Sequence, residues 1–345
     1  MKGSYFLGNG AFEVREMPRM EPGEGEVLIE NRAAGICGTD VHIYLGEEGS
    51  ADVTPPVVLG HEYAGIVRAV GKNVTTVKVG DCVTVDPNIY CGKCRPCRNG
   101  QKQYCDSLSA IGVNRDGGFA EYSCVPQSQV FPMNPDIGLE AKAMAEPLAC
   151  CIHGIERIEL RSGDTVLIVG GGAIGLLMLQ LALLRGASRV VLSEPVAWRR
   201  EIGLKLGACA AIDPSAGDLA AQFMAATGRE GADVVIECVG NTAATAQAIA
   251  LTARGARVLL FSVPKPKTTC ALPLMDVFKK ELVITGSFIN PDSHQQAVDL
   301  LNAGRIRTDV LISHRYGLDS VEEAIRMQMG SDSLKVMIRP HNEKA

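Results

Sequence analysis

Four cysteines lie close together between residues 91 and 105, with the spacing C-x2-C-x2-C-x7-C. Closely spaced thiolates can converge on one tetrahedral zinc ion without a large core around them. Glycine, proline, lysine and arginine between them favour an exposed loop over four scattered core cysteines. Four sulfur ligands leave no open position, so the pattern predicts a structural zinc site rather than a catalytic one. The expected ligands are Cys91, Cys94, Cys97 and Cys105.

Clustered cysteines can also form disulfides, and the cellular compartment decides between the two uses. The N-terminal stretch has neither the apolar segment nor the cleavage pattern of a secretory signal. The most apolar stretch, residues 173–184, is shorter than the roughly 20 apolar residues of a bilayer-spanning helix. These features predict a cytoplasmic protein without a membrane span, in which clustered cysteines bind metal or take part in catalysis.

A glycine-rich motif follows at TVLIVGGGAIG, where Gly170, Gly172 and Gly175 form G-x-G-x-x-G. The motif follows an expected strand and opens an expected helix, so backbone amides could approach a pyrophosphate at the helix N-terminus. Glu194 ends the next strand, about 20 residues further on, where a carboxylate binds ribose hydroxyls and repels a 2′-phosphate. The alternative is a glycine-rich turn that binds nothing. With both features present, the sequence predicts NAD rather than NADP.

Two arginines, Arg199 and Arg200, lie close to this acidic residue. They could face the adenosine end of the cofactor or belong to a solvated helix face. The further candidate cofactor contacts are Ile174, Arg199, Phe261, Val263, Ser287 and Phe288.

Potential metal ligands also recur in the segments GICGTDVHIY, VVLGHEYAG and MAEPLACCIHG. Singly, each has an ordinary explanation, because buried cysteines usually pack and lone histidines are often structural. However, an enzyme that oxidises an alcohol with a nicotinamide must remove the hydroxyl proton. An open zinc site helps by lowering the pKa of a bound oxygen. The candidate residues are Cys37, His42, His61, Glu62 and Glu146.

The elements that must position these residues change character near residue 150. Before it, short β-type runs alternate with glycine and proline turns, which predicts a compact β-rich domain. After it, buried strands alternate with helices, which predicts a parallel sheet covered on both faces. The six strand candidates are TVLIV, RVVLS, AAID, DVVIECVG, RVLLFSV and LVITGSF.

The last part of the chain contains two further expected helices and a strand. One helix lies at HQQAVDLLNAG, and the other begins at Ser320, where SVEE matches a capping box with Glu323 at its third position. The strand is KVMI.

The bulk composition suits a two-domain globular protein. The chain has 345 residues, of which 46% are hydrophobic and 21% charged. Its net charge of −5 argues against a generally basic surface for nucleic acid.

Several motifs occur in the order found in one enzyme family: CGTD-x-H, GHE, the four-cysteine segment, GGFAEY, EPL and GGGAIG. In this order they resemble the zinc-dependent medium-chain dehydrogenases/reductases of the alcohol dehydrogenase superfamily, closest to the polyol and L-threonine dehydrogenase branch. The resemblance covers essentially the whole chain. It implies a GroES-like catalytic domain with a structural zinc lobe at residues 1–150 and a Rossmann NAD-binding domain at 151–289. Residues 290–345 would return to the catalytic domain, with the active site in the cleft.

The resemblance also implies roles for matching residues. Cys37, His61 and Glu146 correspond to ligands of a catalytic zinc ion. Glu62 corresponds to a neighbouring carboxylate that can approach or exchange onto the metal. Many liver-type alcohol dehydrogenases have cysteine as the third ligand, whereas the segment EPLACC offers Glu146, as in polyol dehydrogenases. Some polyol dehydrogenases lack the four-cysteine lobe, which this chain keeps.

Thr39 and His42 match the relay that passes the alcohol proton towards solvent. The implied activity is oxidation of a secondary alcohol by NAD, with two zinc ions per chain and a homodimer or homotetramer. A polyol or sugar alcohol, free or phosphorylated, is the preferred substrate, whereas CGTDVHIY favours L-threonine 3-dehydrogenase. The motifs could also belong to a non-catalytic zinc and NAD sensor or to a zinc-lobe nucleic-acid module. The acidic net charge and the complete second ligand set argue against both.

Overall fold

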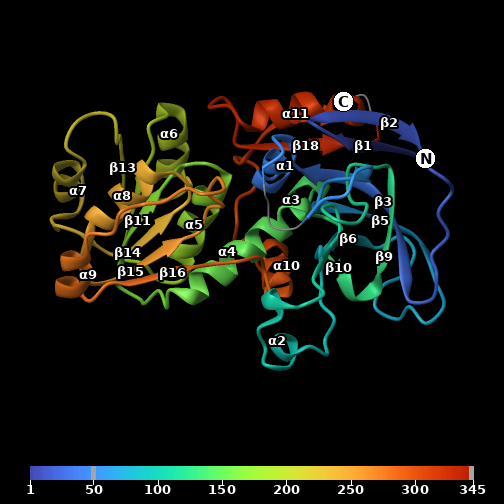
Figure 1. Cartoon of the computed structure of the whole chain (residues 1–345), viewed down its shortest axis with the longest axis horizontal. Helices are drawn as coiled ribbons and strands as arrows, with labels where there is room; N and C mark the ends of the chain where they lie inside the picture. Colours follow the sequence, from blue (N-terminus) through green and yellow to red (C-terminus); the bar gives the residue numbers. More distant parts are fainter. Residues whose placement is uncertain (48–51, 342–345) are drawn as a thin grey trace. The chain divides into compact units, whose positions relative to one another are not determined.

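The computed structural model describes residues 1–47 and 52–341. Two compact units make up the chain, and the first contains both of its ends (Figure 1). This first unit comprises the residues up to Ala149 and those from Asn290 onward, and the second comprises Cys150–Ile289. Helix α4 (Ala145–Arg157) begins in the first unit and ends in the second.

The second unit is built on a six-stranded sheet in which every neighbouring pair is parallel. The strands in spatial order are β13 (Ala210–Ile212), β12 (Arg189–Ser193), β11 (Thr165–Val169), β14 (Ala232–Glu237), β15 (Thr252–Leu260) and β16 (Val283–Gly286). The first strand in sequence, β11, lies at the centre, and the order reverses on its two sides. This is the doubly wound arrangement expected from alternating apolar strands and helices, in which ligands bind beyond the carboxyl ends of the central strands.

Helices pack against this sheet and bury its strands, and β11 is buried along its whole length. The helices of the unit are α5 (Ala173–Leu184), α6 (Ala197–Lys205), α7 (Leu219–Thr227), α8 (Thr242–Ala250) and α9 (Leu274–Lys280). Four expected strands end earlier than predicted, β13 at Ile212, β14 at Glu237, β15 at Leu260 and β16 at Gly286. After β14 the backbone amides of Val239 and Gly240 bond to the Glu237 carboxylate, at 2.6 and 2.9 Å, and turn the chain out of the sheet.

The first unit contains a seven-stranded sheet, a three-stranded sheet and a two-stranded pair. The large sheet runs β10 (Val130–Pro132), β6 (Cys82–Val85), β5 (Glu62–Val70), β3 (Glu26–Gly35), β18 (Lys335–Arg339) and β17 (Ile312–Gly317), and β9 (Tyr122–Pro126) also pairs with β3. The smaller sheets are β2 (Ala11–Glu16), β1 (Lys2–Gly8) and β4 (Val57–Val58), and the pair β7 (Asn88–Ile89) and β8 (Ser109–Ala110).

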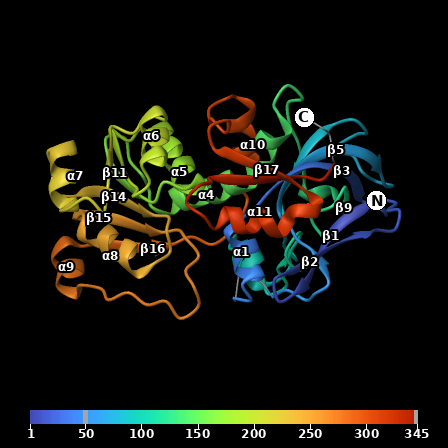
Figure 2. The same ribbon diagram turned by 90° about the horizontal axis from the view of Figure 1, so that it is seen from above.

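Short helices connect these strands. They are α1 (Gly38–Tyr44), α2 (Arg95–Arg98), α3 (Leu139–Ala143), α10 (His294–Asn302) and α11 (Val321–Gln328), with 3₁₀ turns η1 (Lys102–Tyr104), η2 (Gln127–Gln129) and η3 (Leu318–Ser320). Strand β18 inserts beside β3, with Met337 opposite Gly35, so the C-terminal segment becomes part of this sheet. Helices α1 and α11 lie side by side (Figure 2).

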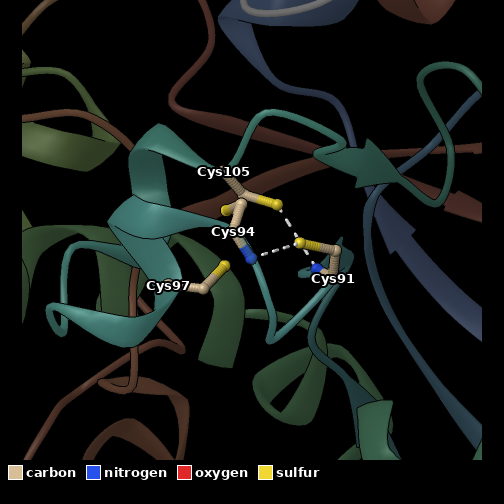
Figure 3. Close-up of side chains that lie close together, drawn as sticks. All are labelled: Cys91, Cys94, Cys97 and Cys105. Carbon is tan, nitrogen blue, oxygen red and sulfur yellow. Dashed lines mark hydrogen bonds between the residues drawn. The ribbon is translucent and has the colours of Figure 1, made fainter.

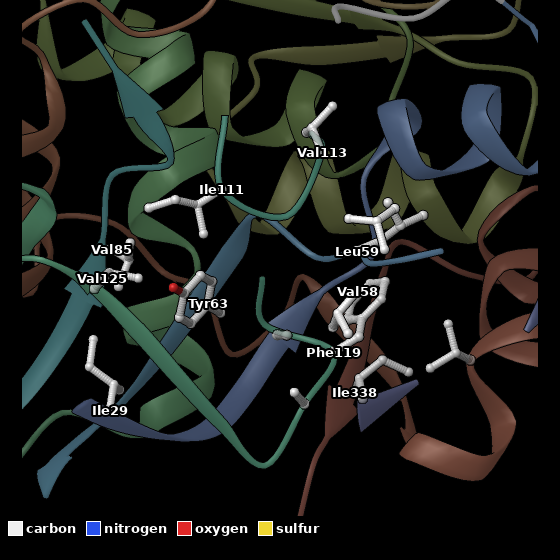
Figure 4. Close-up of a cluster of buried hydrophobic side chains, with 14 of the residues drawn as sticks. Ile29, Val58, Leu59, Tyr63, Val85, Ile111, Val113, Phe119, Val125 and Ile338 are labelled. Carbon is white, nitrogen blue, oxygen red and sulfur yellow. The ribbon is translucent and has the colours of Figure 1, made fainter. Parts of the chain in front are cut away.

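The core of the first unit is formed by apolar side chains from its sheets and from the last segment of the chain (Figure 4). Tyr63 is fully buried there, and its hydroxyl accepts a bond of 3.2 Å from Ser123. On β5 the core residue Tyr63 directly follows Glu62. Because successive strand residues point to opposite faces of a sheet, the Glu62 side chain lies on the face opposite Tyr63. A core-facing tyrosine therefore fixes the side on which the preceding carboxylate lies.

The last expected helix begins where the sequence indicates, since Ser320 precedes α11. The predicted capping box is wrong in detail, because Ser320 makes no side-chain capping bond. The physical reason is that η3 runs directly into α11, so Ser320 has φ −121° and ψ 25° instead of the extended backbone of a capping residue. Within residues 1–47 and 52–341, no helix has the length and apolar character needed to cross a membrane.

Candidate metal and dinucleotide sites

Three potential metal ligands from two strand ends meet in the first unit. Cys37 follows β3, whereas His61 and Glu62 stand at the start of β5. The antiparallel register places Gly35 opposite Glu62, which brings the residues after β3 beside those that open β5. One ligand atom from each of Cys37, His61 and Glu62 lies within 4.8 Å of the others. Sulfur, imidazole nitrogen and carboxylate oxygen are the donors that zinc takes in proteins.

The charges around His61 favour a cation. Burial by itself would lower the pKa of this imidazole, but the Cys37 sulfur and the Asp40 carboxylate raise it well above its ordinary value. Glu146 contributes in the same direction. A buried group of donors whose combined negative charge attracts a proton in this way also suits a divalent metal ion.

Asp40 is a residue of this site to which the sequence by itself gave no role. Its Oδ2 accepts a 2.8 Å bond from the Cys37 amide, and its Oδ1 lies 3.8 Å from Nδ1 of His61. The carboxyl group is fully buried, which raises its pKa to about 6. A carboxylate beside the second nitrogen of a metal-binding imidazole orients the ring and fixes its tautomer. The signal was present in the motif CGTD, because Asp40 lies three residues after Cys37 at the start of α1.

The two acidic candidates differ in their surroundings. Glu62 belongs to the compact donor group, and both of its oxygens are bonded to Nζ of Lys335, at 2.6 and 2.9 Å. Glu146 is buried on α4 and is not part of that group. Its charge nevertheless contributes to raising the pKa values of His61 and Lys335. In the structure Glu62, and not Glu146, belongs to the compact group with Cys37 and His61. The resemblance implied instead that Glu146 is the metal ligand and Glu62 its neighbour.

Thr39 and His42 both lie on α1. Residues three apart on a helix share a face, so the two side chains are neighbours. Thr39 is buried and His42 half-buried, which places the pair between the interior and the surface. Nδ1 of His42 lies 2.8 Å from Oε2 of Glu47, a contact that no motif in the sequence indicated.

The four clustered cysteines also meet, and their sulfur atoms face a common centre (Figure 3). The amides of Cys91 and Cys94 donate to the sulfurs of Cys105 and Cys91, at 3.3 and 3.4 Å. Backbone amides lower the pKa of Cys91 to about 6, whereas burial and the neighbouring thiols raise that of Cys97 to about 12. Four such sulfurs fit a closed tetrahedral site, because a cation allows all of them to ionise together.

The glycine-rich turn connects β11 to α5 at the centre of the parallel sheet. Gly170 has φ +101°, which favours glycine, and a Cβ on Gly175 would lie 1.8 Å from the Gly170 carbonyl oxygen. A Cβ on Gly172 would meet no atom within 4 Å. The first and third glycines are therefore explained by the fold, whereas the open space at Gly172 fits the close approach of a ligand to the backbone.

Glu194 follows β12 and is almost completely buried. Its Oε2 accepts a 2.6 Å bond from the Gly171 amide, and its Oε1 accepts a 2.8 Å bond from the Val196 amide. The carboxylate thus holds the glycine-rich turn directly, which the sequence did not indicate. A carboxylate has about four acceptor sites, so two amide bonds leave capacity for ribose hydroxyls.

The two arginines have separate surroundings. The Arg199 guanidinium lies over the Trp198 ring, 5.5 Å from its centre. Arg200 bonds to the carbonyl of Glu194 at 2.7 Å and forms an ion pair with Asp213 at 3.0 Å. Arg200 is therefore held at the carboxyl ends of β12 and β13 by Glu194 and Asp213.

The remaining expected cofactor contacts lie beyond the carboxyl ends of the same strands or on α5. Ile174 and Ser287 are half-buried, Phe288 is exposed, and Phe261 packs so closely on Gly154 that a Cβ there would lie 2.9 Å from its ring. Val263 is 51% exposed, and Val239, which lies against Gly170, is 46% exposed. Exposed apolar side chains beside a glycine-rich turn fit the flat, largely apolar rings of a dinucleotide.

Comparison with known proteins agrees with this arrangement. Residues 23–135 match the family model of the alcohol dehydrogenase GroES-like domain, and residues 173–303 match that of the zinc-binding dehydrogenases. The L-threonine 3-dehydrogenase of Caldanaerobacter subterraneus subsp. tengcongensis is 35% identical over 331 residues, 94% of either chain. D-arabinitol dehydrogenase 1 of Uromyces fabae is 34% identical over 319 residues, 92% of this chain and 90% of the relative.

A solved structure is also similar throughout. A protein from Sinorhizobium meliloti 1021, determined with NADP bound, has a TM-score of 0.93 and 40% identity and covers 98% of this chain and 99% of its own. The expected fold class, a Rossmann sheet with a GroES-like catalytic domain, is confirmed. These matches span both units, so the chain belongs to the zinc-dependent medium-chain dehydrogenases/reductases, oxidoreductases of the alcohol dehydrogenase type.

Proposed function

We propose that this protein oxidises a secondary alcohol to a ketone, with NAD as the hydride acceptor and zinc beside Cys37 and His61. The main support is the compact donor group of half-buried Cys37 with buried His61 and Glu62, where the negative charge of Cys37 and Asp40 raises the pKa of His61. Zinc in this position would supply Lewis acidity, which lowers the pKa of an alcohol hydroxyl.

The residues of the first unit would divide this work. Cys37, His61 and Glu146 hold the catalytic metal, and Glu62 is the carboxylate that can approach or exchange onto it. Asp40, whose Oδ1 lies 3.8 Å from Nδ1 of His61, would favour the orientation of the ring by its charge. A second metal, held by Cys91, Cys94, Cys97 and Cys105, would stabilise the lobe without taking part in the reaction.

Thr39 and His42 would carry the alcohol proton towards solvent. The proposal is supported by their positions on one helix face, with Thr39 buried and His42 nearer the surface. Histidine is the side chain that most often transfers protons as a general acid or base.

NAD is the proposed cofactor because Glu194 lies at the position where a carboxylate binds the adenosine ribose. Gly170, Gly172 and Gly175 would admit the pyrophosphate, with Ile174, Arg199, Phe261, Val263, Ser287 and Phe288 as the remaining candidate contacts. NADP must be tested directly, since the similar Sinorhizobium meliloti protein was solved with it. The ion pair between Arg200 and Asp213 argues for NAD, because Arg200 is already engaged.

A polyol or sugar alcohol is the proposed substrate class. An acidic third ligand at Glu146 supports this class, as does the likeness to D-arabinitol dehydrogenase 1. The second candidate is L-threonine, the substrate in the names of several relatives of 34–36% identity. Both are secondary alcohols with polar neighbouring groups, so either suits the same chemistry at zinc.

The deciding experiment measures NAD reduction by the zinc-loaded protein with a panel of polyols, polyol phosphates and L-threonine, each repeated with NADP. We expect the highest kcat/KM with one polyol and NAD. Higher kcat/KM with L-threonine would establish the second candidate instead. Binding of NAD without turnover of any alcohol in the panel would favour a non-catalytic sensor and contradict the proposal.

A further inference from the structure

Glu47, which pairs with His42 at the end of α1, has no role in the function proposed above. Nδ1 of His42 lies 2.8 Å from Oε2 of Glu47, and their side chains are only 12% and 21% exposed. An ionised carboxylate can only accept a hydrogen bond, so Nδ1 must be the donor. In the neutral ring this leaves the lone pair on Nε2.

The local sequence explains why the two side chains meet. Helix α1 ends in a Schellman motif, in which Gly46 adopts φ +69° and its amide bonds to the Ile43 carbonyl at 3.1 Å. The next amide, that of Glu47, bonds to the His42 carbonyl at 2.9 Å. Glu47 is thus joined to His42 through both backbone and side chain, so the carboxylate is held beside the ring by the helix end itself.

The charged side chains of the helix packed against α1 pair with groups other than the His42 ring. Helix α11 lies beside α1, and its Arg326 and Glu322 form an ion pair of 2.5 Å (Figure 2). Arg326 also donates to the Tyr44 hydroxyl at 2.9 Å. On α1 itself, Asp40 accepts the Cys37 amide and faces His61. The carboxylate in contact with the His42 ring is that of Glu47.

We infer that Glu47 is a positioning residue for His42, which keeps Nδ1 protonated so that Nε2 receives the proton in the relay. This inference rests on the relay of the proposed function. In that step the Thr39 hydroxyl loses its proton to Nε2 and regains one from the alcohol hydroxyl. The ring becomes an imidazolium that Glu47 stabilises, and it then releases one proton to solvent water. The hydride goes to the proposed cofactor, so no other oxidant is needed.

The first test reads the tautomer of His42 by ¹⁵N NMR of the ring nitrogens in the full-length, zinc-loaded protein. The chain has 6 histidines, and His42→Gln assigns the signals of His42. We expect protonated Nδ1 and unprotonated Nε2 in the neutral ring of the wild type. Glu47→Leu should move the ring towards the Nε2-protonated form, whereas Glu47→Gln should preserve the wild-type tautomer because its amide oxygen still accepts. A wild-type ring protonated on Nε2 would overturn the inference.

The second test compares turnover. Glu47→Leu should lower kcat about tenfold with KM nearly unchanged, and Glu47→Gln should recover part of the loss. In a His42→Gln background, Glu47→Leu should change kcat by less than about twofold, because the two residues act as a unit. Zinc content should stay constant throughout. The matched control is Glu24→Gln, which removes an exposed carboxylate bonded to Asn73 and should leave kcat unchanged.

These measurements distinguish a failure of the positioning role of Glu47 from a failure of the proton relay. An equal loss from Glu47→Leu with and without His42 would overturn the positioning role. If His42→Gln turned over like the wild type at every pH, the relay of the proposed function would fail instead. The NMR result would then decide by itself whether Glu47 sets the tautomer.

Discussion

Nζ of Lys335 lies 2.6 and 2.9 Å from the two carboxylate oxygens of Glu62 and 3.0 Å from the Ile36 carbonyl oxygen. Both side chains are buried, with 4% and 1% exposed. Burial alone would lower the pKa of Lys335, but the negative charges of Glu62, Cys37 and Glu146 raise it instead. Strand β18 thus places an ammonium group beside the donor group, and the surrounding negative charges favour its charged form.

Replacing Lys335 by methionine should destabilise the protein by about 3–5 kcal/mol, because it leaves Glu62 as a buried charge without its partner. Urea unfolding of the purified protein measures the loss. The double variant Glu62→Gln/Lys335→Met should recover much of it, since neither charge remains. A single variant as stable as the wild type would show that Glu62 accepts a proton or that water reaches it at little cost.

Elemental analysis can identify the third ligand of the catalytic metal. Cys37→Ser and His61→Ala should each lose one zinc ion per chain together with activity. Glu146→Ala should do the same if Glu146 is the ligand implied by the family pattern, and Glu62→Gln should then retain the metal. The opposite result, with zinc lost in Glu62→Gln alone, would follow the grouping seen in the structure.

The cysteine lobe should lose its own metal without affecting the catalytic one. Cys94→Ser is expected to reduce zinc from two ions to one and to lower Tm by about 5–10 °C, because metal binding contributes directly to folding of the lobe. Cys209→Ser is the matched control, since Cys209 is exposed and outside both donor groups. One zinc ion in the folded wild type would contradict the assignment.

Cofactor preference should depend on Glu194. Glu194→Ser removes acceptors for the ribose and for the Gly171 and Val196 amides, so kcat/KM with NAD should fall by about tenfold or more. The value with NADP should fall less, because the repulsion of a 2′-phosphate is also removed. Asp213→Asn is a useful comparison, since it weakens the hold on Arg200 and should raise efficiency with NADP alone. Equal use of both cofactors by the wild type would contradict the role of Glu194.

His294 should make the protein acid-sensitive. Burial beside Phe131 lowers its pKa to about 3, whereas an unfolded histidine titrates near about 6.5. The unfolded chain therefore binds the extra proton first, and stability falls as pH drops from about 6.5 towards about 3. His294→Leu should remove about 2 kcal/mol of the loss between pH 7 and pH 5, as measured by urea unfolding at both values. An unchanged loss would show that the ring is protonated or hydrated in the fold.

The local features of this protein follow from short stretches of sequence. Cysteine spacing alone specifies the lobe, because its four sulfurs come from one loop. The alternation of apolar strands with helices likewise predicted a parallel sheet covered on both faces, since each strand and helix depends mainly on its own residues. The Schellman motif at Gly46 and Glu47 is also local in sequence, although the contact between Glu47 and His42 became evident only from the observed helix end.

Tertiary structure alone decided which distant residues meet at the candidate metal site. Lys335 reaches Glu62 across 273 positions because β18 pairs with β3, and no short-range pattern specifies that register. A lone charge in the apolar strand KVMI was the available signal. The same applies to the choice between Glu62 and Glu146, which depends on how β5 and α4 pack. The sequence named the types of donor present, whereas long-range pairing of strands decided which of them meet and how their charges are balanced.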